Sequence, residues 1–301
     1  MQFNSYNTSN VTIAVGLLGV ILNTVVGAAL RRTTVFGYAF GTLCFSQIVA
    51  NIGMCSTFIV LTAGVTVVHP SWHQTYIGLR SGQYVIFFWV ASIFNHLFLA
   101  INRATVINFP LRYSQLFGKP KATNMCVTII WTIAGVQVLP YFFPSCAMTF
   151  DPVSFTYAYG EGVCGEITNH FTVTVVSFLG ILNMITCFRL IKLKEKLNSF
   201  DGEQSSSRRE IRFFFQACAQ SFLLMSTLVS FFFLSNLYPG NSWYLFGTTT
   251  LIWVMVPVLD GLLVVVFNKE IRDVIFGRKP RPQVPSLNSR SSTVLTSLSK
   301  Y

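Results

Sequence analysis

Seven apolar runs, each long enough to cross a lipid bilayer, constrain this chain more than any other feature. A bilayer core of roughly 30 Å needs about 20 apolar residues in a helix. The runs are Val11 to Leu30, about Ala39 to Val68, the stretch between Arg80 and Arg103, about Ala122 to Pro144, Ile167 to Phe188, Arg212 to about Asn236, and about Trp243 to Phe267. Because lipid offers the backbone no hydrogen-bond partner, each run is predicted to be a helix.

The composition excludes several classes of protein. Only 10% of the 301 residues are charged, whereas a soluble domain carries about 25%. The net charge of +11 does not indicate nucleic-acid binding, because the basic residues lie in short segments between the apolar runs. With no catalytic signature and no glycine-rich phosphate loop, we predict neither an enzyme nor a cofactor. His69 and His73 are spaced for one helix face, but two ligands are too few for a structural metal site, so no metal is expected.

The distribution of basic residues predicts the orientation. With the amino terminus outside, the four cytoplasmic segments hold two, four, seven and seven Lys or Arg, which is 20 of the 21, and only Arg80 stays outside. Short cytoplasmic loops of membrane proteins are enriched in this way. We therefore predict an all-α bundle of seven transmembrane helices. Cleavage of the first run as a signal peptide is the less favoured alternative, because no basic residue precedes it.

The ends of the chain differ in character from the membrane domain at residues 11–277. Residues 1–10 are predicted to be an extracellular amino terminus, and residues 268–277 a short amphipathic helix on the cytoplasmic surface. Residues 278–301 are rich in Ser and Thr and are predicted to be a disordered cytoplasmic tail.

Two modifications are predicted on the outer side. Asn7 and Asn10 each begin a glycosylation sequon, and Asn7 lies farther from the membrane; the alternative is an unmodified terminus. Cys146 and Cys164 flank an outer segment in an oxidising compartment, which predicts a disulfide within the second outer loop. The alternative is that Cys146 is buried in lipid and Cys164 is free.

Motifs inside the runs resemble those of rhodopsin-like G-protein-coupled receptors. The run Gly19 to Asn23 resembles their Gly-Asn signature, Asn102-Arg103 resembles their Asp-Arg-Tyr motif, and Trp131 has the expected place in span four. Further segments look like the nematode serpentine chemoreceptor class X (Srx) family over residues ~10 to 277. These segments are Phe40 to Asn51, Ile101 to Arg103, Phe109 to Tyr113 and Phe267 to Arg272.

The resemblance implies a chemosensory receptor that binds an extracellular small molecule and activates an intracellular heterotrimeric G protein. It implies a multi-pass protein of the plasma membrane, with the sensory cilium as a candidate location. A small-molecule transporter and a ligand-gated channel subunit are the alternatives. A transporter would favour several intramembrane ionisable groups and broken helices in related halves, and this sequence has one acid and no evident repeat.

Three polar residues within the spans are predicted to meet near mid-membrane. Asn23, Asn51 and Asp260 lie at similar depths, and an intramembrane acid favours a functional interpretation. Rhodopsin-like receptors usually keep the acid in helix two and an Asn in helix seven, whereas this chain has the reverse. We predict a polar cluster that binds a cation or a proton and biases the inactive state. The alternative is a neutral, hydrogen-bonded structural Asp.

The predicted contacts with the G protein lie at the cytoplasmic ends of the helices. Arg103 is the candidate switch residue, with Asn102 in place of its usual acidic neighbour. Arg112 and Arg212 are placed with them in this coupling set. The alternative for Arg103 is an ordinary arginine that extends to the membrane surface.

The predicted ligand pocket lies between the outer halves of the helices. Tyr84, Trp89 and Trp253 are its candidate residues, and the absence of acids and bases from the outer halves favours a neutral ligand. Two family features are missing, since span six has no Cys-Trp-x-Pro kink and span seven has Asp260-Gly261 where Asn-Pro is usual. These departures put the usual activation path in doubt, though Pro257 offers a kink one turn earlier.

Overall fold

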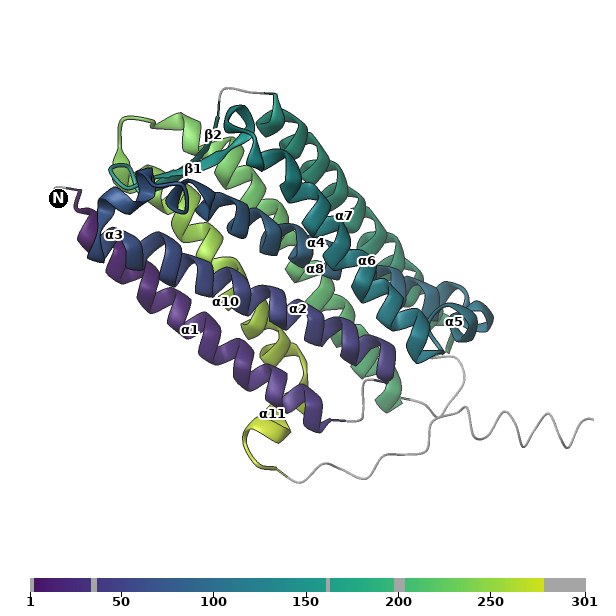
Figure 1. Ribbon diagram of the computed structural model, residues 1–301. Helices are drawn as coiled ribbons and strands as arrows, with labels where there is room; N and C mark the ends of the chain where they lie inside the picture. Colours follow the sequence, from purple (N-terminus) through teal and green to yellow (C-terminus); the bar gives the residue numbers. More distant parts are fainter. Residues whose placement is uncertain (1–2, 34–36, 161–162, 198–203, 279–301) are drawn as a thin grey trace, which may run out of the picture.

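The protein is a bundle of seven long helices (Figure 1). The computed structural model describes residues 3–33, 37–160, 163–197 and 204–278. Its seven membrane-length apolar segments are Ser5–Arg32, Tyr38–Val68, Gly78–Asn108, Pro120–Phe142, Cys164–Lys192, Arg212–Leu237 and Ser242–Phe267. The seven-helix prediction made from apolar length is confirmed.

Several spans combine more than one helical element. The spanning elements are α1 (Ser5–Arg32), α2 (Tyr38–Thr57) with η1 (Phe58–Gly64) and α3 (Val65–Val68), α4 (Ser81–Asn108), α6 (Pro120–Val138) with η4 (Leu139–Phe142), α7 (Cys164–Leu197), α8 (Gln204–Phe232) with η6 (Leu234–Leu237), and α9 (Ser242–Phe246) with η7 (Gly247–Leu251) and α10 (Ile252–Phe267). Both η1 and η7 are π-helical, which widens the second and seventh spans near the same end of the bundle. The short elements between spans are η2 (Pro70–Gln74), η3 (Gly78–Arg80), α5 (Pro110–Leu116), η5 (Pro144–Cys146), β1 (Met148–Asp151), β2 (Thr156–Tyr159) and α11 (Lys269–Ile275).

Six of the long helices pack in a ring. Helix α1 packs against α2 and α10, α2 against α4, α4 against α7, α7 against α8, and α8 against α10. Helix α6 lies outside this ring, against α2 and α4. Helix α4 is therefore the most enclosed of the seven spans, and most of its polar side chains are buried.

The two ends of the bundle carry different structures (Figure 1). At one end, here named the hairpin end, strands β1 and β2 form an antiparallel hairpin that pairs Met148 with Tyr159 and Asp151 with Thr156. This hairpin sits on the start of α4, where a Cβ at Gly82 would collide with the carbonyl of Met148. The amino terminus lies at the same end. The opposite end, here named the α11 end, carries the short helix α11.

The first helix begins earlier in the chain than the sequence predicted. Helix α1 begins at Ser5, six residues before the apolar run, because the side chain of Asn4 caps it by accepting from the backbone N–H of Tyr6 at 2.9 Å. The predicted amphipathic helix is present as α11, which buries Ile271 and is followed by Gly277 at φ 64°. The predicted tail beyond residue 278 and residues 198–203 lie outside the described part of the chain.

The loop between the second and third spans is tied to the hairpin through His73. Its Nε2 lies 2.9 Å from Thr66 Oγ1, and its ring packs at a tilt of 51° against Phe150 with the centroids 4.8 Å apart. The side chain of His73 is therefore buried, although it belongs to a loop, and this burial lowers its pKa. Among the described residues, no group of three or more His, Cys, Asp or Glu is placed to hold a metal.

Acidification is expected to loosen this contact. Because the pKa of buried His73 lies below its unfolded value, the packing is stable above about pH 6.5 and loses stability as the pH falls. Protection of the backbone amides in residues 70–74 and 148–151 against hydrogen exchange, relative to the intrinsic rate at each pH, should therefore fall more than elsewhere between pH 7.5 and pH 5. The variant His73→Asn should remove this difference, and the matched variant His69→Asn should keep it. An unchanged acid response in His73→Asn would contradict the assignment.

Candidate functional site

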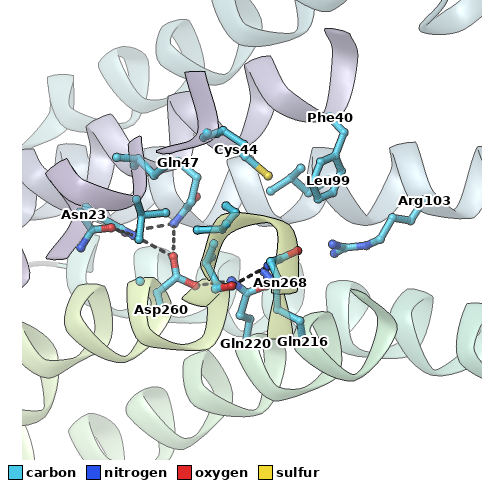
Figure 2. A pocket seen from close by; sticks show the side chains of 17 residues that line it. Asn23, Phe40, Cys44, Gln47, Leu99, Arg103, Gln216, Gln220, Asp260 and Asn268 are labelled. Atoms are coloured by element: carbon cyan, nitrogen blue, oxygen red, sulfur yellow. Dashed lines mark hydrogen bonds between the residues drawn. The ribbon is translucent and has the colours of Figure 1, made fainter. Parts of the chain in front are cut away.

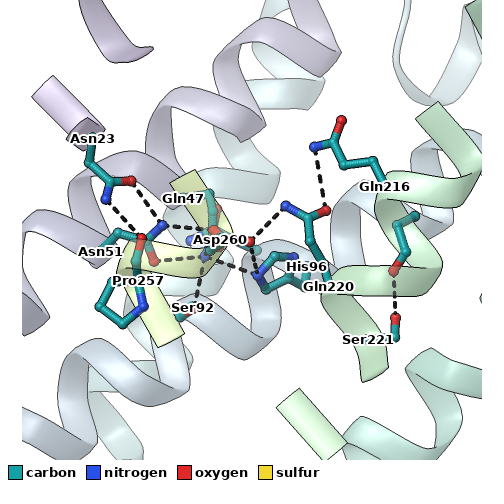
Figure 3. Close-up of polar contacts among 12 residues, drawn as sticks. Asn23, Gln47, Asn51, Ser92, His96, Gln216, Gln220, Ser221, Pro257 and Asp260 are labelled. Atoms are coloured by element: carbon teal, nitrogen blue, oxygen red, sulfur yellow. Dashed lines mark hydrogen bonds and ion pairs between the residues drawn. The ribbon is translucent and has the colours of Figure 1, made fainter. Parts of the chain in front are cut away.

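A buried carboxyl group is surrounded by polar side chains from several helices (Figure 3). Asp260 on α10 is 2% exposed. Its Oδ2 accepts hydrogen bonds from Asn51 Nδ2 at 2.7 Å and from Gln47 Nε2 at 3.3 Å, both on α2. Its Oδ1 accepts from Gln220 Nε2 on α8 at 2.7 Å and lies 3.4 Å from His96 Nε2 on α4. Side chains from three neighbouring helices thus converge on one carboxyl group, which satisfies a costly buried acid.

Helix α1 joins this cluster through Asn23. Its Oδ1 accepts from Asn51 Nδ2 at 3.1 Å, and its Nδ2 donates to the carbonyl of Pro257 at 2.9 Å. Gly261 gives the amide room, because a Cβ there would lie 3.2 Å from Asn23 Nδ2. The structure therefore brings Asn23, Asn51 and Asp260 into one hydrogen-bonded group, while their role stays a prediction.

Sequence reasoning missed Gln220 as a member of the cluster, and it likewise missed Gln47, Ser92 and His96. Gln47 Nε2 lies 2.8 Å from Ser92 Oγ and 3.1 Å from His96 Nε2. A signal for these residues was present, since Gln47 precedes Asn51 by four positions and Ser92 precedes His96 by four. Residues at that spacing share a helix face.

A chain of amides leads from Asp260 toward the α11 end. Gln220 Oε1 accepts from Gln216 Nε2 at 3.5 Å, and Gln216 Oε1 accepts from Asn268 Nδ2 at 2.7 Å. In every link the nitrogen points toward Asp260 and the carbonyl oxygen points away from it. The last oxygen, Asn268 Oδ1, is buried and has no hydrogen-bond partner among the described residues. Aligned dipoles of this kind favour a negative charge at Asp260 and a positive charge beyond Asn268.

Arg103 provides a positive charge near that end. Its side chain on α4 is 9% exposed, and its Nε has no hydrogen-bond partner in the described part of the chain. Arg103 lines the same cavity as Gln216, Asn268 and Asp260, and Figure 2 shows its guanidinium pointing toward Asn268. The cavity volume of about 20 Å³ suits one water-sized occupant. Arg103 and the carboxyl group of Asp260 thus line one cavity, with the chain of amides between them.

The predicted coupling residues occupy different surroundings. Asn102 is buried beside Arg103 on α4, and its Nδ2 has no hydrogen-bond partner among the described residues. Arg112 is exposed on α5, and Arg212 is partly buried on α8. The structure therefore places the four residues at one end of the bundle, on three different helices, without gathering them into one cluster.

The hairpin end carries an aromatic cluster. The rings of Trp89 and Trp253 lie edge to face with their centroids 5.8 Å apart. The ring of Tyr157, from β2, lies 6.1 Å from Trp253. Tyr84, in contrast, is 50% exposed, so of the three predicted pocket residues the structure brings together only the two tryptophans.

Side chains of the hairpin fill the space above these tryptophans. Phe155, with a φ of 56°, is fully buried, and its carbonyl accepts from Thr250 Oγ1 at 2.7 Å. The hydroxyl of Tyr157 lies 2.6 Å from Thr62 Oγ1 on η1. The hairpin is therefore packed into the bundle rather than lying loosely above it.

A disulfide and a capped turn hold the hairpin. Cys146 and Cys164 are bonded, with their Cα atoms 5.3 Å apart, which confirms the predicted bridge. Partial burial acts to raise the pKa of Asp151, but hydrogen bonds from Ser154 and from the backbone of Val153 outweigh it and hold that pKa below its ordinary value. Asp151 is therefore a charged cap of the turn between the strands.

The two glycosylation candidates are exposed on the first turns of α1. The hydroxyl residues of their sequons, Ser9 and Thr12, are buried and bonded to backbone carbonyls within the helix. Modification of Asn7 and Asn10 stays a prediction.

Comparison with known proteins assigns the family. The family model described as "Serpentine type 7TM GPCR chemoreceptor Srx" matches residues 13–268. The chain belongs to the Srx family. This match contains every member of the polar cluster, Arg103 and the aromatic pair, and it confirms the family resemblance of the sequence motifs.

Individual relatives agree with Srx membership. The chain is 26% identical to "Serpentine receptor class X 45" of Caenorhabditis elegans over 293 residues, which cover 90% of this chain and 80% of that protein. It is 24% identical to "Serpentine receptor class X-43" of the same organism, covering 93% and 88%. It is 31% identical to "Melatonin receptor type 1C" of Gallus gallus over 131 residues, covering 42% and 36%.

Srx membership confirms the receptor prediction. The protein is a multi-pass membrane receptor of a G-protein-coupled family, with a ligand and a heterotrimeric G protein as partners, and it is not an enzyme. The transporter and channel alternatives receive no support from these comparisons.

Exchange of the carboxyl group between Asp260 and Asn51 tests the polar cluster. Asp260→Asn should lower thermal stability because several N–H donors lose their carboxylate, and Asn51→Asp should lower it by placing two carboxyl groups in contact. The double variant restores one carboxylate, so its midpoint of thermal unfolding should lie above that of either single variant. The expected coupling is about 1–2 kcal/mol. Asn236→Asp, at an exposed position, is the control and should be near neutral. If the stability effects of the two single variants simply add in the double variant, the two residues do not share one charge site.

Proposed function

We propose that the hairpin end faces the outside of the cell and the α11 end faces the cytoplasm. Three observations support this orientation. The basic residues gather in segments at the α11 end, the disulfide lies at the hairpin end, and the sequons of Asn7 and Asn10 lie there too. The receptor then resides in the plasma membrane, with the sensory cilium as its site in a chemosensory cell.

The ligand of this receptor is a small neutral molecule that acts at the hairpin end. The aromatic side chains around Trp89 and Trp253 suit an apolar or weakly polar compound. Trp253 and Asp260 are seven residues apart on α10, which places them on one helix face about two turns apart. A ligand that shifts the hairpin-end half of α10 thereby acts on the polar cluster. This connection is the observation that carries the proposal.

The polar cluster holds the inactive arrangement of the helices. The carboxylate of Asp260 on α10 favours the arrangement in which α2, α4 and α8 all present N–H groups or an imidazole to it. The cavity shared with Arg103 is where a bound cation or proton would modify this preference. A ligand changes the balance only through its different affinity for the two arrangements.

The G protein binds at the α11 end. Arg103 is the switch residue there, with Asn102 beside it and with Arg112 and Arg212 as further basic contacts. Because Arg103 is held by no carboxylate among the described residues, its guanidinium is available to a partner once α8 moves aside. The basic segment 192–212 adds positive charge, and phosphorylation of the Ser/Thr-rich tail would oppose coupling.

One experiment separates this function from transport or conduction. Cells that express the receptor are exposed to a panel of neutral small molecules, and nucleotide exchange on heterotrimeric G proteins is compared with membrane current and with uptake. The expected result is nucleotide exchange without current or uptake. Current or uptake without nucleotide exchange would overturn the proposal.

Replacement of the switch residue should uncouple the receptor. Arg103→Ala is expected to reach the cell surface at a normal level and to lose at least about tenfold in nucleotide exchange, the factor that corresponds to 1.4 kcal/mol. Arg32→Ala is the matched control, because this exposed arginine lies at the same end of the bundle outside the cavity. Normal nucleotide exchange by Arg103→Ala would assign the residue to membrane anchoring alone.

A further inference from the structure

A second cavity opens at the hairpin end. Its volume is about 270 Å³, and it lies between strand β2 and the ends of α8, α9 and η7. This volume is close to the lower limit of small-molecule pockets, about 300 Å³. The cavity is separate from the polar one, with which it shares no lining residue.

The edge of strand β2 forms one wall of this cavity. All four of its residues, Thr156 to Tyr159, line the cavity in unbroken succession. Because successive side chains alternate between the two faces of a strand, a pocket on one face would be lined by every second residue. Four consecutive lining residues therefore show that the strand presents its backbone edge.

The hairpin register leaves two peptide groups free along that edge. Gly160 N donates to Ala147 O at 2.9 Å, and the register pairs Met148 with Tyr159 and Phe150 with Tyr157. Hydrogen-bonded and non-bonded pairs alternate in an antiparallel ladder. Tyr157 and Tyr159 consequently occupy non-bonded positions, and their N–H and C=O groups point away from β1. Neither the backbone N–H nor the backbone C=O of these two residues bonds to another described element.

The other walls of the cavity carry no charge, and their hydroxyl groups already donate hydrogen bonds. Phe231, Phe232 and Leu245 supply apolar surface, and no charged residue lines the cavity. The hydroxyls of Ser235 and Thr249 donate to backbone carbonyls of their own helical segments. Unpaired strand edges accept a further extended backbone. The unused hydrogen-bonding capacity of this cavity therefore lies mainly in the β2 backbone.

We propose that this cavity binds a short neutral ligand containing secondary amides, such as one or two peptide units, which extends β2 as a third strand. The amide N–H and C=O of the ligand pair with Tyr157 and Tyr159, and its apolar groups face Phe231 and Phe232. Strand addition of this kind gives affinity through the main chain and specificity through the flanking walls. This inference rests on the proposed receptor function only where it treats the bound molecule as a signalling ligand.

Such a ligand is well placed to act on α10. Tyr157, whose backbone would pair with the ligand, packs its ring against Trp253. Phe231, from the opposite wall, also packs against Trp253 with the centroids 5.2 Å apart. Occupation of the cavity would therefore press on the same tryptophan from two sides, one on the hairpin and one on α8.

A tethered probe tests the site while the natural ligand is still unidentified. The full-length variant Asn236→Cys, at an exposed position in the cavity wall, is labelled with a thiol-reactive chain that carries an N-acetylglycine methylamide group. A second sample carries an all-hydrocarbon chain of equal length. The tether raises the local concentration of the probe, so weak binding still registers. Tyr76→Cys, exposed at the same end and outside the cavity lining, is the control attachment site.

Amide hydrogen exchange at Tyr157 and Tyr159 is the readout. The amide chain on Asn236→Cys should slow exchange at one of these two positions by about five- to tenfold, as expected for one added hydrogen bond, because an extended N-acetylglycine methylamide turns only one C=O toward each edge. The hydrocarbon chain, and either chain on Tyr76→Cys, should leave it unchanged. No slowing by the amide chain would overturn the site, and equal slowing by both chains on Asn236→Cys would show occlusion in place of strand pairing.

Nucleotide exchange measured on the same labelled receptors separates the two proposals. Slowed amide exchange together with G-protein activation supports both of them. Slowed amide exchange without activation keeps the binding site and contradicts its link to signalling. Activation in the untethered receptor by another compound, with no slowing at β2, keeps the receptor function and rejects this site.

Discussion

The hydrogen bonds that converge on the carboxyl group of Asp260 constrain the rest of the bundle. An acid in the membrane interior is stable only when neighbouring groups replace water, and here amide donors from α2 and α8 and an imidazole from α4 do so. Asn23 extends the group to α1. The relative positions of five helices are therefore tied to one side chain, and a shift of any of them changes the environment of that carboxyl group.

The β1–β2 hairpin constrains the hairpin end of the bundle in a similar way. It is fixed by the disulfide, by His73 and by the burial of Phe155, and it covers the aromatic pair that a deep ligand would contact. The same packing leaves one edge of β2 open toward α8 and η7. Since α10 carries both Trp253 and Asp260, the hairpin end and the polar cluster are connected through a single helix, and Arg103 lies at the far end of the amide chain that begins there.

Much of this architecture was predictable from sequence, but unevenly. Apolar length gave the seven spans, and two loop cysteines gave the disulfide. The depths of Asn23, Asn51 and Asp260 suggested their meeting, because depth follows from a fixed rise per residue. Gln47, His96 and Gln220 were missed, since depth alone does not say which face of a helix turns inward. Tyr84 was assigned to the pocket for the same reason, and its side chain is half exposed.

The sequence by itself determined what must lie in the membrane and which residues are costly there. Both follow from local quantities, namely apolar length, loop charge and the presence of an acid in a span. Only the tertiary structure decided which amides donate hydrogen bonds to that acid, in which direction their dipoles run toward Arg103, and which edge of the hairpin stays open. Those outcomes depend on the rotation of each helix about its axis and on the register of two strands, which arise from packing between segments distant in the chain.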